Sequence, residues 1–341
     1  MMNRQKIKER TMSYKAVKLV TRPETDITPA CFELVELDIP ALEPGQILIK
    51  QTHMSLDPAM RGWMSAATDS YIPPVGLGEV MRSSGVGEVV ESRNDRFPVG
   101  AKVAGMFGWR EYLVSSGEGV SIMPQELPAA AILSVLALPG VTAYHGLMEV
   151  AKPKAGETLL VSGAAGSVGS LVGQIAKAEG LRVIGVAGSE EKCRWLVEEL
   201  GFDAAINYKS EDLAQAVKAA APNGIDIYFE NTGGPVQHVA MANMSAFGRI
   251  VVCGVIADYN AATPAPGPSW TQIVKKRLSI QGFTMPDHMH RFGDLSQKVG
   301  AYLLEGKIKY RTHELKGLES AIEGINLLFT GANEGKLLVR L

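Results

Sequence analysis

The sequence predicts an α/β protein with two parts, a β-rich barrel-like part and a doubly wound parallel sheet. The chain of 341 residues is long enough for about two domains of ~150 residues each. Short apolar runs separated by Gly, Pro and Asp recur over residues 13–137, as in a compact β-domain. Strand and helix patterns then alternate over residues 158–283, which is typical of a parallel sheet covered by helices on both faces.

Residues 1–12, MMNRQKIKERTM, are basic and lack the apolar core of a secretory signal. We expect a disordered extension here, or an upstream start with Met12 as the natural beginning. The β-rich part follows, and its expected strands lie at residues 16–20, 32–37, 47–50, 85–91, 102–106 and 111–114.

Residues 130–150 have a helical, Ala-rich pattern, and we place a domain boundary near them. The parallel sheet is expected to use strands at residues 158–162, 182–187, 204–207, 225–230, 249–253 and 278–283. A helix at 295–305, a strand at 309–314, a helix at 317–331 and a last strand at 335–341 complete the chain. The last segments are expected to rejoin the N-terminal part, so the predicted domains are 13–137 with 311–341, and 138–310.

The stretch from Thr158 to Glu179 organises the rest of the chain. An apolar strand leads into a turn with Gly163, Gly166 and Gly169, and an amphipathic helix follows. Such a turn presents free backbone N–H groups and the positive end of a helix dipole to a pyrophosphate. Ala164 replaces the first glycine of the usual fingerprint, so a tight turn without a ligand remains the alternative.

Composition excludes several functions. The net charge is −2, which gives no electrostatic basis for binding nucleic acid or an anionic membrane. No run of residues reaches the ~20 apolar positions that a membrane span needs. Cys31, Cys193 and Cys253 are scattered, which argues against a disulfide framework and a cysteine zinc site and fits a reducing cytoplasm.

Several motifs in order along the chain resemble the medium-chain dehydrogenase/reductases. They are Met54–Arg61 (MSLDPAMR), Gly163–Gly169 (GAAGSVG), Gly188–Lys192 (GSEEK), Asn207–Lys209 (NYK), Phe229–Gly234 (FENTGG), Phe247–Ile250 (FGRI) and Gly331–Lys336 (GANEGK). The resemblance covers nearly everything after Met12 and is closest to the zinc-independent double-bond reductases, which include the prostaglandin/alkenal reductases and the bacterial NADPH-dependent curcumin reductases. It implies a GroES-like β-barrel catalytic domain joined to a Rossmann NADP-binding domain.

The resemblance also implies that no metal is used. Zinc alcohol dehydrogenases of this superfamily carry a ligand cysteine and a Gly-His-Glu, but the matching places here are 54–57 (MSLD) and 76–79 (GLGE). Without zinc no Lewis acid polarises an alcohol, which favours reduction of an activated C=C bond. The expected enzyme therefore reduces α,β-unsaturated ketones or aldehydes. A quinone reductase on the same scaffold and a non-catalytic NADPH-binding protein remain alternatives.

The expected cofactor is NADP(H). The second strand of the parallel sheet ends in Gly188-Ser189, without the carboxylate that NAD-selective sites place there. The resemblance assigns the 2′-phosphate to Lys192 and Tyr208, with Ser189 as a helper. In the alternative, Glu190 or its neighbour holds the ribose and Lys192 is a solvated helix residue. The other cofactor contacts implied are Gly166, Ser167, Val168, Gly169, Asn231, Cys253, Gly254, Val255, Ile256, Tyr259, Phe283, Thr284, Met285 and Asn333.

Three groups are candidates for stabilising the enolate that forms when a hydride reaches the β-carbon: the nicotinamide ribose 2′-hydroxyl and two tyrosines. Tyr259 stands in a long Pro- and Gly-rich loop where the family carries a matching tyrosine, and a phenol donates a hydrogen bond without being charged. Tyr71 stands in a Pro-flanked loop, SYIPP, of the β-rich part. Either residue is alternatively an ordinary loop aromatic. By resemblance, residues 278–283 are expected to pair two subunits as a homodimer.

Overall fold

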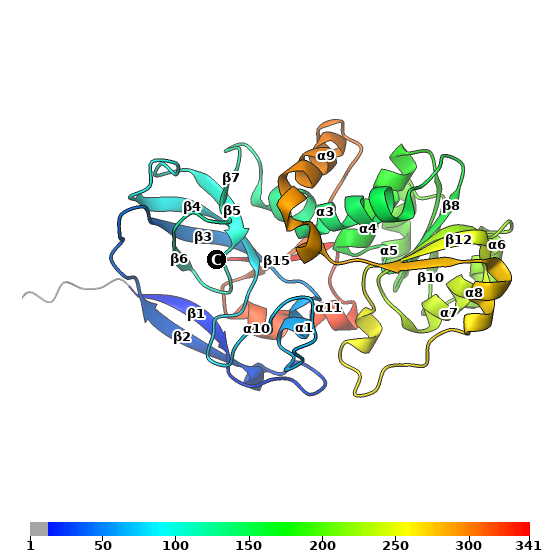
Figure 1. Cartoon of the computed structure of the whole chain (residues 1–341), viewed down its shortest axis with the longest axis horizontal. Helices are drawn as coiled ribbons and strands as arrows, with labels where there is room; N and C mark the ends of the chain where they lie inside the picture. The colour runs from blue at the N-terminus through cyan, green and yellow to red at the C-terminus, as the bar shows by residue number, and fades with distance from the viewer. Residues whose placement is uncertain (1–12) are drawn as a thin grey trace, which may run out of the picture.

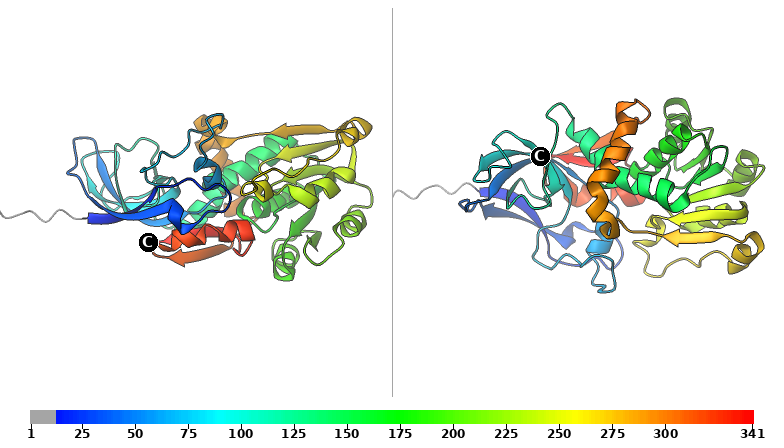
Figure 2. Two further views of the ribbon diagram at one scale, coloured as in Figure 1. Left: turned by 90° about the horizontal axis from the view of Figure 1, so that it is seen from below. Right: turned by 45° about the horizontal axis from the view of Figure 1, so that its top comes forward.

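Two lobes lie side by side in the computed structural model, which describes residues 13–341. The expected extension at residues 1–12 lies outside the described residues. Figure 1 shows a β-rich lobe in blue and cyan and a helix-covered lobe in green and yellow, and both views of Figure 2 keep the two lobes adjacent. The red C-terminal strand β15 (Lys336–Arg340) lies in the β-rich lobe, as the sequence predicts.

The β-rich lobe is barrel-like. A seven-stranded sheet has the order β14-β15-β3-β4-β5-β7, with β6 paired to β3, and β1 and β2 form a separate antiparallel pair. Its strands and short helices are β1 (Ser13–Leu19), η1 (Pro29–Cys31), β2 (Phe32–Asp38), β3 (Ile47–Ser55), α1 (Met60–Trp63), β4 (Ser84–Ser92), β5 (Lys102–Met106), β6 (Tyr112–Ser115), β7 (Ser121–Ile122) and β14 (Thr312–Lys316). The expected strands are present, and several extend further than the patterns indicate.

The second lobe contains a six-stranded parallel sheet with the order β10-β9-β8-β11-β12-β13. The order reverses beside β8, which is the arrangement of a doubly wound dinucleotide fold. The strands are β8 (Thr158–Val161), β9 (Arg182–Ala187), β10 (Ala204–Asn207), β11 (Ile225–Glu230), β12 (Met244–Val252) and β13 (Ser279–Gly282). β12 begins earlier than expected, because Met244 already pairs with Ile225 ahead of an irregularity in the register.

Helices cover both faces of the parallel sheet (Figures 1 and 2). The predicted apolar stripe of α4 (Ser167–Ala178) packs in the core through Leu171, Val172 and Ile175. The remaining helical segments of this lobe are α5 (Glu190–Arg194), η4 (Trp195–Glu199), α6 (Leu213–Ala220), α7 (Gly234–Ala242), η5 (Ile256–Asp258), α8 (Trp270–Lys276), η6 (Met285–Arg291) and α9 (Phe292–Leu304).

Residues 129–151 form one long helical segment of four parts, namely α2 (Ala129–Ala131), η2 (Ile132–Leu136), α3 (Leu138–Tyr144) and η3 (His145–Ala151). Its length and composition suffice for a membrane span, so the expectation that no such run exists is wrong on these criteria. The most apolar window is 67% buried within the protein, as in the core helix of a globular fold. Burial in the core explains the apolar composition of this segment.

The C-terminal region differs from its expected boundaries. The single helix predicted at 317–331 is divided into α10 (Ser320–Gly324) and α11 (Leu327–Thr330). A Cβ at Gly324 would lie 2.1 Å from a side-chain carbon of Leu315, so α10 packs tightly on β14 at this point. After α11, Gly331 adopts φ +68° and turns the chain toward β15. The segment 331–335 thereby reaches the junction between the two lobes.

Candidate functional site

The carboxyl-terminal edge of the parallel sheet carries the predicted cofactor residues. Within two residues after β8, β9, β11, β12 and β13 come, respectively, Gly163, Gly188, Asn231, Cys253 and Phe283. Parallel strands end at the same edge of a sheet, and open α/β sheets bind ligands outside that edge. Gly166 forms an isolated bridge with Gly335, so the edge faces the segment that leads into β15.

The glycine turn has the geometry that close approach requires. Gly163 has φ +58°, which favours glycine, and Gly166 is the N-cap of α4. A Cβ at Gly169 would lie 2.4 Å from the carbonyl oxygen of Gly163, so only glycine lets the helix lie this close to the strand. The first-turn N–H groups of α4 at Ser167 and Val168 have no intrahelical acceptor and can serve an anion.

Basic and hydroxyl groups gather around Gly188. The Ser189 hydroxyl is the N-cap of α5 and accepts from the Lys192 amide at 3.2 Å. The Tyr208 hydroxyl would lie 3.4 Å from a Cβ at Gly188. The Lys209 ammonium lies 5.9 Å from the centroid of the Tyr208 ring. The sequence reasoning did not assign Lys209, although its position directly after Tyr208 was the available signal.

The Lys192 ammonium crosses between the lobes. It donates to the carbonyl oxygen of Gly331 at 2.7 Å. Burial lowers its pKa, with a smaller contribution from nearby Lys209. A lysine has three N–H donors, so donors remain for a phosphate beside Gly188. The location at the second strand end is therefore suited to an anionic substituent.

Glu190, the carboxylate that the alternative assigns to the ribose, already has hydrogen-bond partners within the protein. Glu190 Oε1 accepts from the Asn207 amide at 2.7 Å and from the Ser210 hydroxyl at 2.9 Å. These two hydrogen bonds lower the pKa of the Glu190 carboxyl. The carboxylate thus anchors the segment that carries Tyr208, which weakens the alternative in which it holds a ribose.

A buried polar group that the sequence reasoning missed supports Asn231. Glu230 is fully buried, and its Oε1 accepts from the Ser162 hydroxyl at 2.8 Å and from the amides of Thr232 and Gly233. Ser162 in turn accepts from the Asn231 amide and, through its carbonyl, from the Asn231 side chain, both at 2.8 Å. This network holds the end of β11 against the end of β8.

The two candidate tyrosines lie on opposite lobes. Tyr259 follows η5, and its hydroxyl would lie 2.8 Å from a Cβ at Gly254, so the phenol lies over the end of β12. Burial raises the pKa of Tyr259, and the proximity of Cys253 and Tyr71 raises it further. Desolvation likewise raises the pKa of Tyr71, whose residue is 55% exposed overall. Both phenols are therefore held in the neutral, hydrogen-bond-donating form.

The remaining predicted residues lie along the same edge in different environments. Burial raises the pKa of the Cys253 thiol to about 12, so this side chain stays protonated. Cys253 and Gly254 follow the end of β12, and Ile256 begins η5. Met285 is 6% exposed and packs in the core, which restricts it to backbone contacts.

Phe283 packs against the ring of His145 at a centroid distance of 5.4 Å, and the Thr284 hydroxyl approaches Asp287 at 3.4 Å. The Asn333 side chain donates to the carbonyl oxygen of Gly335 at 2.9 Å, which shapes the segment crossing the glycine turn. Phe283 and Asn333 thus border the carboxyl edge from opposite lobes.

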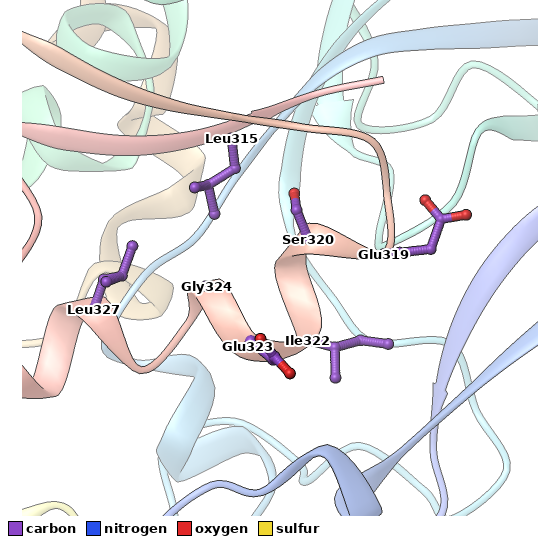
Figure 3. A pocket seen from close by; sticks show the side chains of 7 residues that line it. All are labelled: Leu315, Glu319, Ser320, Ile322, Glu323, Gly324 and Leu327. Atoms are coloured by element: carbon purple, nitrogen blue, oxygen red, sulfur yellow. The ribbon is translucent and has the colours of Figure 1, made fainter.

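Two hollows in the protein surface differ in how they lie relative to the carboxyl edge of the parallel sheet. One of about 420 Å³ lies at the lobe junction and is lined by Asp26, Ile27, Ile256, Ala257, Asn260, Asn326, Phe329 and Thr330. The other, about 630 Å³, runs along α10 and is lined by Leu315, Glu319, Ser320, Ile322, Glu323, Gly324 and Leu327 (Figure 3). None of the predicted cofactor residues lines the second hollow.

The places matched to zinc ligands have structural roles. Met54 is fully buried in the barrel core, and Glu79 accepts from the amide of Gly76 at 2.9 Å. Within residues 13–341 no group of three or more His, Cys, Asp or Glu side chains is arranged to hold a metal ion.

Comparison with known proteins identifies the family. Residues 15–123 match the family described as the N-terminal domain of oxidoreductase, and residues 167–300 match the family described as zinc-binding dehydrogenase. The chain is 41% identical over 330 residues to the NADPH-dependent curcumin reductase of Escherichia coli K12, covering 95% of both chains. The chain belongs to the zinc-independent medium-chain dehydrogenase/reductases.

Other members of the family agree with this assignment. The chain is 41% identical to prostaglandin reductase 1 of Bos taurus, and the match covers 92% of this chain and 94% of the bovine protein. A crystal structure of CurA in complex with NADPH from Vibrio vulnificus has a TM-score of 0.90 at 41% identity, covering 96% of this chain and 98% of the other. The predicted recognition and the predicted pair of a barrel-like and a Rossmann domain are therefore confirmed.

Proposed function

We propose that this protein reduces the carbon–carbon double bond of α,β-unsaturated ketones and aldehydes with NADPH. Similarity over nearly the whole chain to an NADPH-dependent curcumin reductase and to prostaglandin reductases supports this reaction. The structural observation that carries the proposal is the position of the Tyr259 hydroxyl over Gly254, at the carboxyl edge of the sheet. Two neutral phenols, with no metal-ligand cluster within residues 13–341, suit an enolate better than an alcohol.

The cluster around Gly188 is proposed to select NADP(H) over NAD(H). Lys192 and Lys209 supply positive charge, and Tyr208 and Ser189 supply hydroxyl groups. A cation and hydroxyl donors match a doubly charged 2′-phosphate, and charge-assisted hydrogen bonds are the strong ones. The glycine turn at Gly166–Gly169 holds the pyrophosphate. Asn231, the backbone from Cys253 to Ile256, Phe283, Thr284, Met285 and Asn333 complete the proposed site.

When bound, NADPH supplies the hydride that reaches the β-carbon of the substrate. Negative charge then develops on the carbonyl oxygen, where a hydrogen-bond donor stabilises the transition state. Tyr259 is the proposed donor, because its hydroxyl lies over Gly254 at the end of β12 and a neutral phenol donates a hydrogen bond. Tyr71, on the loop of the opposite domain, is proposed to cover the substrate and to offer a second hydroxyl.

A direct assay separates this proposal from its alternatives. The purified protein should consume NADPH with 3-nonen-2-one and show little consumption without an acceptor. Preference for 1,4-benzoquinone over the enone would instead indicate a quinone reductase, and no turnover with either would indicate a non-catalytic NADPH-binding protein. Rates should be unchanged after treatment with EDTA. Loss of rate on chelation, restored by zinc, would contradict the metal-free reaction.

The domain division proposed is 13–137 with 311–341 for the catalytic domain and 138–310 for the NADP-binding domain. A cytoplasmic location is proposed, because the cysteines Cys31, Cys193 and Cys253 are all free thiols. Binding to nucleic acid or to a membrane is not expected at a net charge of −2 and with the apolar segment 129–151 largely buried.

A homodimer formed through β13 is also proposed. β13 is the last strand of the parallel sheet and, among residues 13–341, pairs only with β12, so one row of its backbone groups is free to pair with a second copy. Exposed apolar side chains lie on β13 and on α8, with Ile280 at 44%, Trp270 at 81% and Val274 at 77% exposure. Replacing Ile280 with lysine should convert a dimer to a monomer in analytical ultracentrifugation; a wild-type monomer at micromolar concentration would contradict the proposal.

A further inference from the structure

Asn260 connects the two domains at the residue directly after Tyr259. Its side-chain oxygen accepts from Nε of Arg61 at 3.1 Å, and its side-chain nitrogen donates to Asp26 at 3.2 Å. Residues 261–267, which follow, are all exposed. Asn260 therefore anchors the Tyr259 loop to the opposite domain just before the chain runs into solvent.

Arg61, the hydrogen-bond donor to Asn260, is itself held in a fixed position. It is 8% exposed and donates to the backbone carbonyls of Pro23, Glu24 and Thr25 at 3.1–3.2 Å. The same guanidinium thus holds the segment that leads to Asp26 and also reaches Asn260. A planar guanidinium with several acceptors at fixed angles restricts the relative positions of all its partners.

The Arg61–Asn260 contact lies close in the sequence to both candidate tyrosines. Arg61 lies on α1, and the loop that carries Tyr71 follows this helix. Asn260 and Asp26 both line the hollow of about 420 Å³ at the domain junction, together with Ile256. The contact therefore lies where the Tyr259 loop meets the domain that supplies Tyr71.

We propose that Asn260 is a positioning residue, which holds Tyr259 at the reacting end of the cleft by joining Arg61 and Asp26. The inference rests on the role given to Tyr259 above. Each of the two hydrogen bonds has a charged partner, Arg61 or Asp26, and charge-assisted hydrogen bonds are stronger than those between neutral groups. Losing them allows the loop to leave its position, and a small displacement of a donor from a developing charge lowers the rate.

In the Asn260–Asp26 pair the amide donates and the carboxylate accepts, so exchanging the two side chains tests the hydrogen bond. Asn260→Asp places a carboxylate against Asp26 and removes the donor, whereas the double variant Asp26→Asn with Asn260→Asp restores one donor facing one acceptor. Asp26→Asn alone should stay near wild type, because two facing amides can still form one hydrogen bond. Asn223→Asp, at an exposed turn position, is the matched control.

We expect Asn260→Ala, which loses both contacts, to lower kcat for 3-nonen-2-one by roughly 10-fold, with the Kd of NADPH changed less than about twofold. Asn260→Asp keeps the acceptor for Arg61 but repels Asp26, so its kcat should fall less, by roughly fivefold. The double variant should recover kcat to near the wild-type value, which a merely structural role of either residue would not produce. An unchanged kcat in Asn260→Ala, or a double variant no better than Asn260→Asp, would overturn the inference. An equal loss of NADPH affinity would do the same.

Hydrogen exchange of the backbone amides at residues 256–260 gives a readout independent of turnover. Exchange there should accelerate in Asn260→Ala and return to the wild-type rate in the double variant. Unchanged exchange in Asn260→Ala would show that Asn260 does not hold the loop. If the wild-type protein fails to reduce the enone, the proposed function is wrong, and the exchange result still decides whether this contact anchors the loop.

Discussion

The ammonium group of Lys336 lies 2.6 Å from the carboxylate of Asp57 in the interior of the barrel-like domain. Lys336 is 1% exposed and also donates to the carbonyl oxygen of Leu56 at 2.9 Å. The two residues are 279 positions apart in the sequence, so no local pattern pairs them. The ion pair joins the end of β3 to the start of β15, just after the segment that crosses the glycine turn.

Breaking this buried pair should destabilise the protein strongly. Asp57→Asn leaves the Lys336 charge without its counter-ion, which typically costs about 3–5 kcal/mol. Thermal unfolding should show a clear fall in Tm. The control is Glu319→Gln, which removes the exposed ion pair to Lys15 and should change stability by no more than about 1 kcal/mol. Equal effects of the two substitutions would contradict the role given to burial.

Removing the cation at Lys192 should change the choice of cofactor. Lys192→Ala should raise KM for NADPH by about 10- to 100-fold and that for NADH far less, since a charge-assisted hydrogen bond to the 2′-phosphate is lost. Steady-state kinetics with both cofactors measure the ratio. Lys218→Ala, at an exposed position on α6, is the control. Equal changes for NADPH and NADH would remove the assignment of Lys192 to the phosphate.

Removing the Tyr259 hydroxyl should slow the chemical step. Tyr259→Phe retains the ring that packs over Gly254 but loses the donor, and kcat should fall about 10- to 100-fold with little change in KM for NADPH. Tyr112→Phe, in β6 of the barrel-like domain, should be unaffected. A wild-type kcat in Tyr259→Phe would leave stabilisation of the enolate to the ribose hydroxyl of the cofactor and to water.

The Glu149–Arg291 pair should make stability depend on acidic pH. Hydrogen bonds from Arg291 lower the pKa of Glu149 from 4.5 to about 2. A folded-state pKa below the unfolded value stabilises the fold above pH ~4.5, and this contribution is lost as the pH falls toward 2. At pH ~7, Glu149→Gln should cost about 1 kcal/mol, reduced by solvent screening.

The Tm difference between wild type and Glu149→Gln, followed from about pH 6 down to about pH 3, tests this dependence. The difference should shrink steadily as the pH falls. A constant difference over this range would mean that the carboxylate is not stabilised by Arg291 in the folded protein.

Local patterns determined most of the fold. The apolar runs at residues 182–187, 204–207 and 225–230 form strands with the predicted bounds. Strands buried inside a parallel sheet are apolar along their whole length, so the pattern is visible without knowing which strands are neighbours. The glycine turn was equally predictable, since the φ +58° of Gly163 and the close contact at Gly169 require glycine itself. Element ends were less predictable: α10 and α11 are divided just after Gly324, where α10 packs against Leu315 of the preceding strand β14, and side-chain packing of this kind leaves no mark in the periodicity.

The sequence by itself determined the two-domain α/β architecture, the glycine turn and the residue types around Gly188, because each depends on local periodicity, backbone sterics or the nature of a side chain. Only the tertiary structure decided which distant residues meet. Lys192 with Gly331, Asn260 with Arg61 and Lys336 with Asp57 are separated by 139, 199 and 279 positions. No periodicity spans such intervals. The contact of Lys336 with Asp57 forms only when the barrel-like domain packs its core, and the other two form only when the two domains meet.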